Sequence, residues 1–511
     1  MPVVHRHGRA VLILVVLASL AAACTADGPT PAPIPSSSVA LSGPPADLAR
    51  YYDQSITWKG CGGEFECAQV TVPRDWSQPD AGDLEVPVLR LPASDPGSRI
   101  GSLLVNPGGP GVSGVDYARA ARAQFTAPVR AAYDIVGFDP RGTGGTNPVR
   151  CLPSEQLDDF FAADPTPDDV GEQRELLASI SDLTKGCEAK SGGILPHVST
   201  EDTARDLDVI RAALGDEKLS YLGASYGTYL GAVYAGLFPD RVGRLVLDGA
   251  LDPSLDGVET GKGQLQGFQQ AFDSFVADCA THDDCPLPED PTAAGARIAA
   301  FYRELDASPL PTFDAARPLT EGLANLGIGE ALYAPEYFWE PLRTGLAQAF
   351  GGDGSTLLQL ADLYTDRKDD GSFGNLLEAN IAINCLDKGS LKELSEAQAL
   401  VPEYEKLSPV FGAGFAWGSI SCRDWPYPPV ATSAPITAEG AAPILVVGTT
   451  RDPATPYAWA QALAEQLSSG VLLTYDGDGH TAYNRGNACI NRAVEAYLVA
   501  GTAPDDGTTC G

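Results

Sequence analysis

A serine flanked by glycines near the middle of the chain constrains the fold more than any other feature. Ser225 is the centre of Gly-Ala-Ser-Tyr-Gly (223–227), which joins an apolar segment typical of a buried strand (218–222) to a segment with helical spacing (226–238). So tight a junction forces strained backbone angles on its central residue and requires neighbours without bulk. We therefore predict that Ser225 projects above a strand end as a nucleophile, with the N–H of Tyr226 free to stabilise an oxyanion.

Strand and helix patterns alternate on both sides of this serine. We expect a capped helix at 200–214 and strands at 70–73, 84–91, 101–105, 133–138, 241–248, 442–448 and 471–475. This alternation predicts an α/β fold, in which helices cover both faces of a mostly parallel sheet.

The strand patterns stop near residue 250, return near residue 441, and leave helical patterns between. A crossover between parallel strands needs only about a dozen residues. The interval therefore predicts a large, mainly helical cap over the sheet. The expected organisation is a leader (1–23), a tether (24–48), the first part of the core (49–250), the cap (251–440) and the second part of the core (441–511).

A serine nucleophile needs a base to accept its proton, and histidine is the usual one. His480 follows the apolar strand pattern 471–475 in a glycine-rich loop. After the leader, the other histidines are His197, in a loop before the serine, and His282, between two cysteines. We predict that His480 is the base.

The base in turn needs an acid to orient it. Asp452 lies just beyond the strand pattern 442–448, so the chain order becomes serine, aspartate, histidine, as expected for this sheet architecture. We predict that Asp452 is this acid. Asp248 and Asp252, which follow the preceding strand, are the alternatives.

A second glycine-rich loop follows the strand pattern 101–105. It reads Asn-Pro-Gly-Gly-Pro-Gly (106–111), and paired glycines allow backbone amides to approach a ligand closely. We predict that Gly108 and Gly109 complete an oxyanion hole with Tyr226. The alternative is an ordinary turn between a strand and a helix.

The first residues have the pattern of an export signal. Arg6 and Arg9 precede an apolar run (10–23) that is too short to span a bilayer, and Leu-Ala-Ala-Ala leads into Cys24. This resembles a bacterial lipobox, in which Cys24 carries the lipid; plain secretion is the alternative. A proline-rich segment (25–45) then predicts a tether. We expect an exported protein of the cell envelope, anchored by lipid to the outer face of the membrane or secreted.

Eleven cysteines fit an oxidising compartment, because ten remain when Cys24 is set aside. The chain has no Cys-x-x-Cys pair and few histidines, so we expect no zinc or other metal site and no cofactor. Connectivity cannot be derived from sequence. The hypothesis adopted pairs neighbours along the chain: Cys61–Cys67, Cys151–Cys187, Cys279–Cys285, Cys385–Cys422 and Cys489–Cys510.

The net charge of −33 argues against nucleic acid or anionic membrane surfaces as partners. We expect a monomer that contacts the membrane by its lipid anchor alone. Asp387, beside a paired cysteine of the cap, is a candidate to bind a substrate ammonium group. A solvated or salt-bridged aspartate is the alternative.

Taken together, the motifs at 106–111, 223–227, 452–456 and 479–480 resemble those of the secreted tripeptidyl aminopeptidases, a branch of the α/β-hydrolases related to prolyl aminopeptidases. The resemblance covers residues 50–510. It implies the α/β-hydrolase fold, peptide or protein substrates, and a serine exopeptidase that releases short peptides, tripeptides among them, from free N-termini. It also implies that Thr455 supports the triad by hydrogen bonding.

Two other functions remain open at this stage. An esterase or lipase would use the same triad, because ester and amide hydrolysis share this machinery. A lipoprotein without catalytic activity could use the same cleft to bind peptides.

Overall fold

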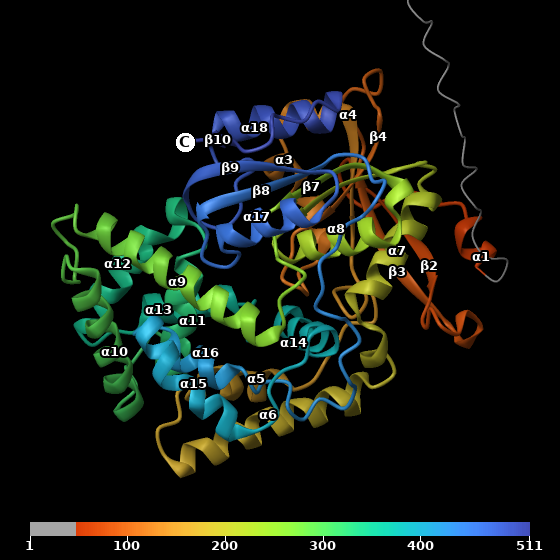
Figure 1. The fold of residues 1–511 in the computed structure, drawn as a ribbon. Coiled ribbons are helices and arrows are strands. Elements are labelled where there is room, and N and C mark those ends of the chain that lie inside the picture. The colour runs from red at the N-terminus through yellow and green to blue at the C-terminus, as the bar shows by residue number, and fades with distance from the viewer. Residues whose placement is uncertain (1–47) are drawn as a thin grey trace, which may run out of the picture. The chain divides into compact units, whose positions relative to one another are not determined.

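The computed structural model describes residues 48–511, and the leader, Cys24 and most of the tether lie outside this part. Its centre is one sheet with the strand order β1-β2-β3-β5-β4-β6-β7-β8-β9-β10. From β5 across to β10, every neighbouring pair of strands is parallel. The pairs β1–β2, β2–β3 and β3–β5 are antiparallel. The predicted α/β-hydrolase fold, with its mostly parallel sheet, is confirmed (Figure 1).

The strands are β1 (Lys59–Gly60), β2 (Glu66–Pro73), β3 (Asp83–Leu91), β4 (Gly101–Asn106), β5 (Tyr133–Phe138), β6 (Leu219–Ala224), β7 (Val242–Asp248), β8 (Ile444–Arg451), β9 (Gly470–Asp478) and β10 (Thr508–Cys510). Every strand expected from its apolar pattern is present. The two edge strands β1 and β10 were not anticipated, because two or three residues are too few to show an alternating pattern.

Helices cover both faces of the sheet. On one face, α7 (Thr200–Ala213), α8 (Tyr226–Leu237) and α17 (Tyr457–Gln466) share a core with the sheet. On the other face, the core residues come from α2 (Gly114–Arg119), α3 (Ala121–Gln124), α4 (Ala127–Ala132) and α18 (Ala488–Glu495). Because both faces are covered, the central strands are buried almost throughout.

The cap forms a core of its own, separate from the two beside the sheet. The cap helices are α9 (Gly257–Cys279), α10 (Pro291–Ala307), α11 (Glu321–Ala331), α12 (Pro335–Phe350), α13 (Ser355–Tyr364), α14 (Leu376–Asp387), α15 (Leu394–Leu407) and α16 (Gly412–Gly418). Of these, α14 packs its buried side chains in the core of α7 and α8 beside the sheet. In Figure 1 the cap helices lie together on one side of the sheet. The short α1 (Ala49–Tyr52) precedes the first strand.

The cap also draws on residues before the serine. Helices α5 (Ser154–Ala162) and α6 (Val170–Ser191) lie among the cap helices in Figure 1. Asp158 of α5 pairs with Arg317 and Arg367 of the cap, and Ile180 of α6 packs in a small core with Trp417. The expected core segment 49–250 therefore includes two helices that pack with the cap. Their sequences have helical spacing, but this spacing does not indicate whether the helices pack on the sheet or with the cap.

Five disulfides are present, and they are the five pairs of neighbours along the chain. Cys385–Cys422 ties α14 to the segment after α16, within the cap. Among residues 48–511, no helix is long and apolar enough to cross a bilayer.

Candidate active site

The turn around Ser225 has the strained geometry that its glycines predict. β6 ends and α8 begins on either side of Ser225, whose φ of 55° and ψ of −124° are rare for a residue with a side chain. A Cβ on Gly223 would lie 2.3 Å from the carbonyl oxygen of Gly227, and a Cβ on Gly227 would lie 2.8 Å from that of Asn106. Both flanking positions therefore require glycine, and the serine is held at the carboxyl end of the sheet.

The imidazole of His480 lies against the carboxylate of Asp452, at the ends of the neighbouring strands β9 and β8. His480 Nδ1 is 2.8 Å from Asp452 Oδ1 and 3.0 Å from Oδ2. The carboxylate is buried and also accepts the N–H groups of Ala454, Thr455 and Thr481, at 2.9–3.1 Å. It can thus hold the Nδ1–H tautomer, which leaves Nε2 free to accept a proton.

The end of β7 lies beside both the predicted nucleophile, Ser225, and the predicted base, His480. The Ser225 N–H donates to the carbonyl oxygen of Asp248 at 2.9 Å. A Cβ on the next residue, Gly249, would lie 3.4 Å from Cε1 of His480 and 3.1 Å from Thr455 Oγ1. In the described residues the hydrogen bonds of the His480 ring are those of Nδ1. None of these bonds reaches the Ser225 hydroxyl, and a catalytic hydrogen bond of this kind often forms only when substrate binds.

A family model and three curated relatives match this chain. A family model described as TAP-like protein matches residues 408–510. The chain is 38% identical over 485 residues to "Serine protease Hip1" of Mycobacterium tuberculosis, which covers 89% of this chain and 91% of that one. It is 38% identical over 454 residues to "Carboxylesterase B" of the same species, with 87% and 86% covered. It is 33% identical over 483 residues to "Tripeptidyl aminopeptidase" of Streptomyces lividans, with 90% and 88% covered.

The chain belongs to the tripeptidyl aminopeptidase-like family of α/β-hydrolases. It is a serine hydrolase. The remaining predicted site residues of this family member divide into those that the fold brings to the Ser225 turn and those that it uses elsewhere.

Thr455 lies beside the base. Its N–H donates to Asp452 at 2.9 Å, and its Oγ1 is 3.3 Å from His480 Nδ1. A hydroxyl at this position can keep the Asp452 carboxylate and the His480 imidazole in place relative to each other, as the family resemblance implies. Asp248, the alternative acid, instead accepts the N–H groups of Ala482 and Tyr483 at 3.0 and 2.8 Å. Burial raises the pKa of its carboxyl group.

The two glycines proposed for the oxyanion hole have different roles. The N–H of Gly108 donates to Asn106 Oδ1 at 2.9 Å, so this amide is already used, and the expectation for Gly108 is corrected. A Cβ on Gly108 would lie 2.8 Å from Ser225 Cβ, which shows how closely the loop approaches the nucleophile. Within residues 48–511 the amides of Gly109 and Tyr226 have no recorded acceptor. They are the pair left to bind an oxyanion.

Asp387 does not serve as a free carboxylate for a substrate amine. It is 2% exposed and accepts both the N–H and the hydroxyl of Thr200, at the start of α7. Burial raises its pKa to about 6. The expectation for Asp387 is therefore corrected: it joins α14 to α7. Sequence alone could not reveal this, because its partner lies almost two hundred residues earlier.

Two cap residues near the base were missed by sequence reasoning. Tyr333 accepts the backbone N–H of His480 at 2.8 Å, and the two rings meet edge to face with centroids 5.3 Å apart. Burial raises the pKa of the Tyr333 and Tyr364 hydroxyls, and Glu330, at the end of α11, adds to both shifts. Burial raises the pKa of Glu330 itself to about 7. An acid near the end of a cap helix has no distinguishing pattern in the sequence.

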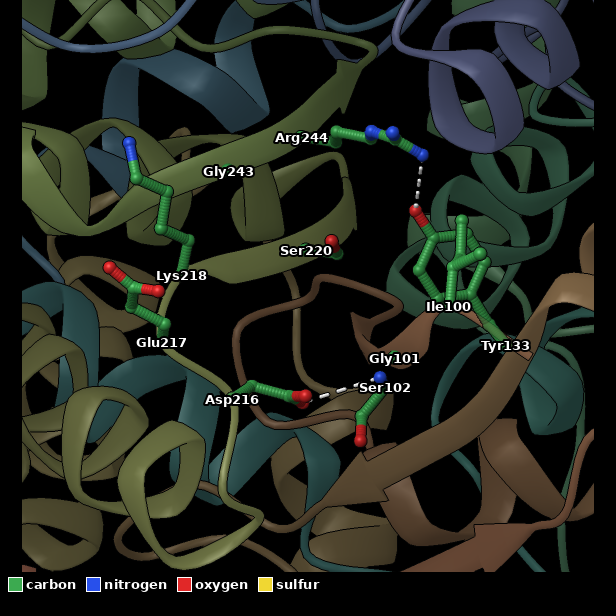
Figure 2. Close-up of a pocket in the computed structure, with 10 residues that line it drawn as sticks. All are labelled: Ile100, Gly101, Ser102, Tyr133, Asp216, Glu217, Lys218, Ser220, Gly243 and Arg244. Carbon is green, nitrogen blue, oxygen red and sulfur yellow. Dashed lines mark hydrogen bonds between the residues drawn. The ribbon is translucent and has the colours of Figure 1, made fainter.

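A cavity of about 440 Å³ lies at the opposite edge of the sheet, by the amino ends of β4, β6 and β7 (Figure 2). Its charged groups are largely used within the fold: Arg244 donates to Tyr133 and to the carbonyl oxygen of Leu498, and Asp216 accepts the N–H of Ser102. Ligands of such sheets bind at the carboxyl ends of the strands. This cavity is therefore not the catalytic site.

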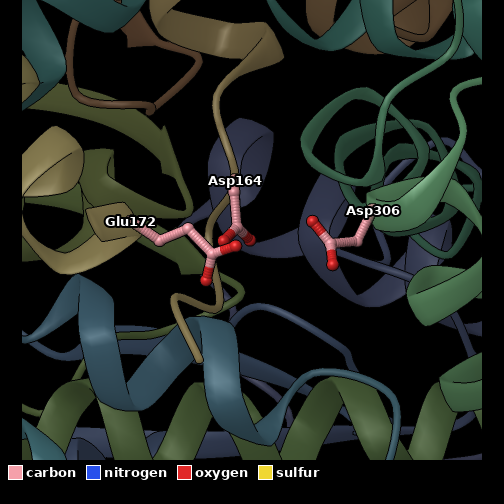
Figure 3. A group of neighbouring side chains, drawn as sticks. All are labelled: Asp164, Glu172 and Asp306. Carbon is pink, nitrogen blue, oxygen red and sulfur yellow. The ribbon is translucent and has the colours of Figure 1, made fainter. Parts of the chain in front are cut away.

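Three carboxylates converge where α6 approaches α10 (Figure 3): Asp164, Glu172 and Asp306. Burial raises the pKa of Asp164, with Glu172 and Asp306 adding to the rise. Acidic side chains often gather in this way without an ion. The group lies apart from the triad and has no evident part in the hydrolysis.

Proposed function

We propose that this chain is an exported serine aminopeptidase that releases short peptides, tripeptides among them, from the free N-termini of peptide substrates. The observation that carries the proposal is the Asp452–His480 pair, 2.8 Å apart, beside the strained turn that presents Ser225. The relatives named as a serine protease and a tripeptidyl aminopeptidase support peptides as the substrates.

In the proposed mechanism, His480 accepts the Ser225 proton as the hydroxyl oxygen attacks the scissile carbonyl carbon. The N–H groups of Tyr226 and Gly109 donate to the resulting oxyanion, and each such donor is worth about 2.7–4 kcal/mol. His480 then protonates the leaving amine as the tetrahedral intermediate collapses to an acyl-enzyme. Water, deprotonated by His480, releases the peptide. Asp452 orients the imidazole and stabilises its charged form throughout.

Release from the N-terminus requires a group that recognises the substrate ammonium, and we propose Glu330 for this role. Glu330 is partly buried near the end of α11, three residues before Tyr333, whose carbonyl oxygen accepts the His480 N–H. Among residues 48–511 it has no ion pair or hydrogen bond to satisfy it. A cationic partner would favour its ionised form.

For the whole chain we propose the arrangement expected from the sequence: a leader at 1–23, a lipid on Cys24, a tether to residue 48, and a cap at 251–440 between the two parts of the core, joined by α5 and α6. The ten paired cysteines support folding in an oxidising compartment. We propose that the enzyme works as a monomer in the cell envelope.

The test compares a free-amine tripeptide anilide, the same substrate with an acetylated amine, and a short acyl ester. We expect rapid cleavage of the free-amine peptide alone, and loss of both cleavage and fluorophosphonate labelling in Ser225→Ala. An esterase is the second candidate, because one relative is named a carboxylesterase. Ester hydrolysis without peptide cleavage would favour it. Equal cleavage of the blocked and free peptides would contradict the aminopeptidase proposal.

A further inference from the structure

Cap residues hold two of the catalytic loops directly. The loop after β4 (106–111) contacts α14. Asn380 donates to the carbonyl oxygen of Pro110 at 3.2 Å, and a Cβ on Gly111 would lie 2.4 Å from the carbonyl oxygen of Leu376. The loop after β8 (452–456) meets α9, where Gln264 donates to the carbonyl oxygen of Ala454 at 3.1 Å. The cap thus forms part of the scaffold of the site.

The loop that carries the base (479–485), here called the base loop, is held by the cap as well. The His480 N–H donates to Tyr333 just before α12. Arg485, five residues after the histidine, donates to the carbonyl oxygens of both His480 and Tyr333. Its guanidinium also pairs with Glu336 in the first turn of α12, with Nε 2.9 Å from Oε1. Both backbone polar groups of the catalytic histidine are therefore bonded to the cap or to a side chain that the cap holds.

The base loop needs such support because its backbone is strained. Thr481 has a φ of 67° and Asn484 a φ of 60°, and the first is a β-branched residue in the left-handed region. Strained backbone persists where surrounding contacts fix it, and it often occurs at sites of function. Asp452 and Asp248 fix the core side of this loop, through Thr481, Ala482 and Tyr483. Glu336 and Tyr333 fix the side that faces the cap.

We propose that Arg485 is a positioning residue that couples the seating of the cap to the alignment of His480 with Ser225. When α12 is seated, Glu336 orients the guanidinium, and the guanidinium holds the His480 carbonyl oxygen. When α12 moves away, the histidine loses both backbone contacts on that side. This inference rests on the proposed role of His480 as the base.

The magnitudes favour an effect on rate over an effect on stability. The Arg485 and Glu336 side chains are 15% and 39% exposed, and an ion pair this exposed contributes little to folding. A misplacement of about 1 Å at a catalytic group, by contrast, can lower a rate about 100-fold. Binding of substrate against the cap would then raise catalysis by seating α12, without a further contact to the reacting atoms.

The experiment measures kcat, KM and the rate at which a small fluorophosphonate acylates Ser225. The variants are Arg485→Met, Arg485→Lys and Glu336→Gln, together with the double variant Arg485→Met, Glu336→Gln. The matched control is Lys262→Met, which removes another cap ion pair, with Glu403, away from the catalytic loops. Unfolding temperatures are recorded for every variant.

We expect Arg485→Met to lower kcat and the acylation rate about 10- to 100-fold and to leave KM within about twofold, and we expect Arg485→Lys to restore part of the loss. Glu336→Gln should lower kcat about threefold in the wild-type background and have no effect in the Arg485→Met background, because the two residues act through one contact. Lys262→Met should match the wild type.

Acylation of Arg485→Met at the wild-type rate, or equal effects of Glu336→Gln in both backgrounds, would overturn the coupling. Should Arg485→Met fail to fold, Arg485→Lys and Glu336→Gln carry the same test. Normal acylation in His480→Ala would overturn the proposed base itself. If His480→Ala abolished acylation while the Arg485 variants acylated at the wild-type rate, the coupling would be overturned and the role of His480 as the base would stand.

Discussion

Two opposing effects act on the carboxyl group of Glu330. Burial favours its neutral form and raises its pKa to about 7. A bound ammonium would favour the ionised form and so must offset part of that cost. We therefore expect binding of a free N-terminus by Glu330 to depend on pH near 7. Most carboxyl groups are already fully ionised there.

The sign of this dependence follows from which form binds. Below about pH 7 Glu330 is protonated, so it cannot pair with an ammonium, and KM for a free-amine tripeptide anilide should rise as the pH falls. Above about pH 8 the substrate amine loses its own charge. We therefore expect a minimum of KM between these values. Glu330→Gln should raise KM about tenfold at that minimum, the equivalent of about 1.4 kcal/mol, and flatten the profile.

Glu403→Gln is the control for this prediction, because Glu403 is a surface carboxylate of the cap that pairs with Lys262. Its KM profile should follow that of the wild type. An unchanged profile in Glu330→Gln would show that another group binds the ammonium. KM measured for an amine-blocked ester substrate should not respond to either substitution.

At the scale of single elements, α9 approaches the loop that carries Asp452 so closely that a side chain is excluded. A Cβ on Gly267 would lie 2.5 Å from the carbonyl oxygen of Pro453 and 2.9 Å from that of Asp452. These are backbone atoms, which cannot move aside as the end of a flexible side chain could, so position 267 requires glycine. Nearer the start of the same helix there is open space, because nothing lies within 4 Å of a Cβ on Gly261.

These two glycines give a matched pair of substitutions. Gly267→Ala should push α9 away from the Asp452 loop, lower the stability by about 1–3 kcal/mol, and lower kcat at the same time. Gly261→Ala should stabilise the helix by up to about 1 kcal/mol, because alanine favours a helix over glycine, and should leave kcat unchanged. Unfolding in urea and steady-state kinetics check both. Similar behaviour of the two variants would contradict the close contact.

Elements with strong local patterns were predictable from sequence. The strands around Ser225, the turn at Gly223 and Gly227, and helices such as α12 and α13 follow from residues next to one another. The partners of Gly108 and Asp387 were not predictable, because a hydrogen bond from an amide to Asn106 or from a carboxylate to Thr200 depends on tertiary packing. The position of α5 and α6 was not predictable either, because their apolar spacing would be helical whether they packed on the sheet or in the cap.

At the scale of the whole described chain, the site lies where two separately packed layers meet. The part of the chain that forms the sheet carries Ser225, Asp452 and His480. The cap, with its own apolar core, carries Tyr333, which accepts the His480 N–H, and Glu330, which we propose binds the substrate ammonium. The stability of the cap therefore affects catalysis even though the predicted triad lies outside it. Two disulfides stabilise the cap in addition to its apolar core.

The two disulfides of the cap close loops of very different length, and this predicts their relative importance. Cys385–Cys422 spans 37 residues and Cys279–Cys285 spans 6. By loop entropy, the first should contribute about 4 kcal/mol and the second about 2 kcal/mol. Replacing each pair by serines should lower the urea midpoint in that order. Loss of the longer one should also lower kcat, because α14 carries Asn380, which binds the loop of Gly109. Equal losses, or a reversed order, would show that local packing in the cap outweighs the constraint on the unfolded chain.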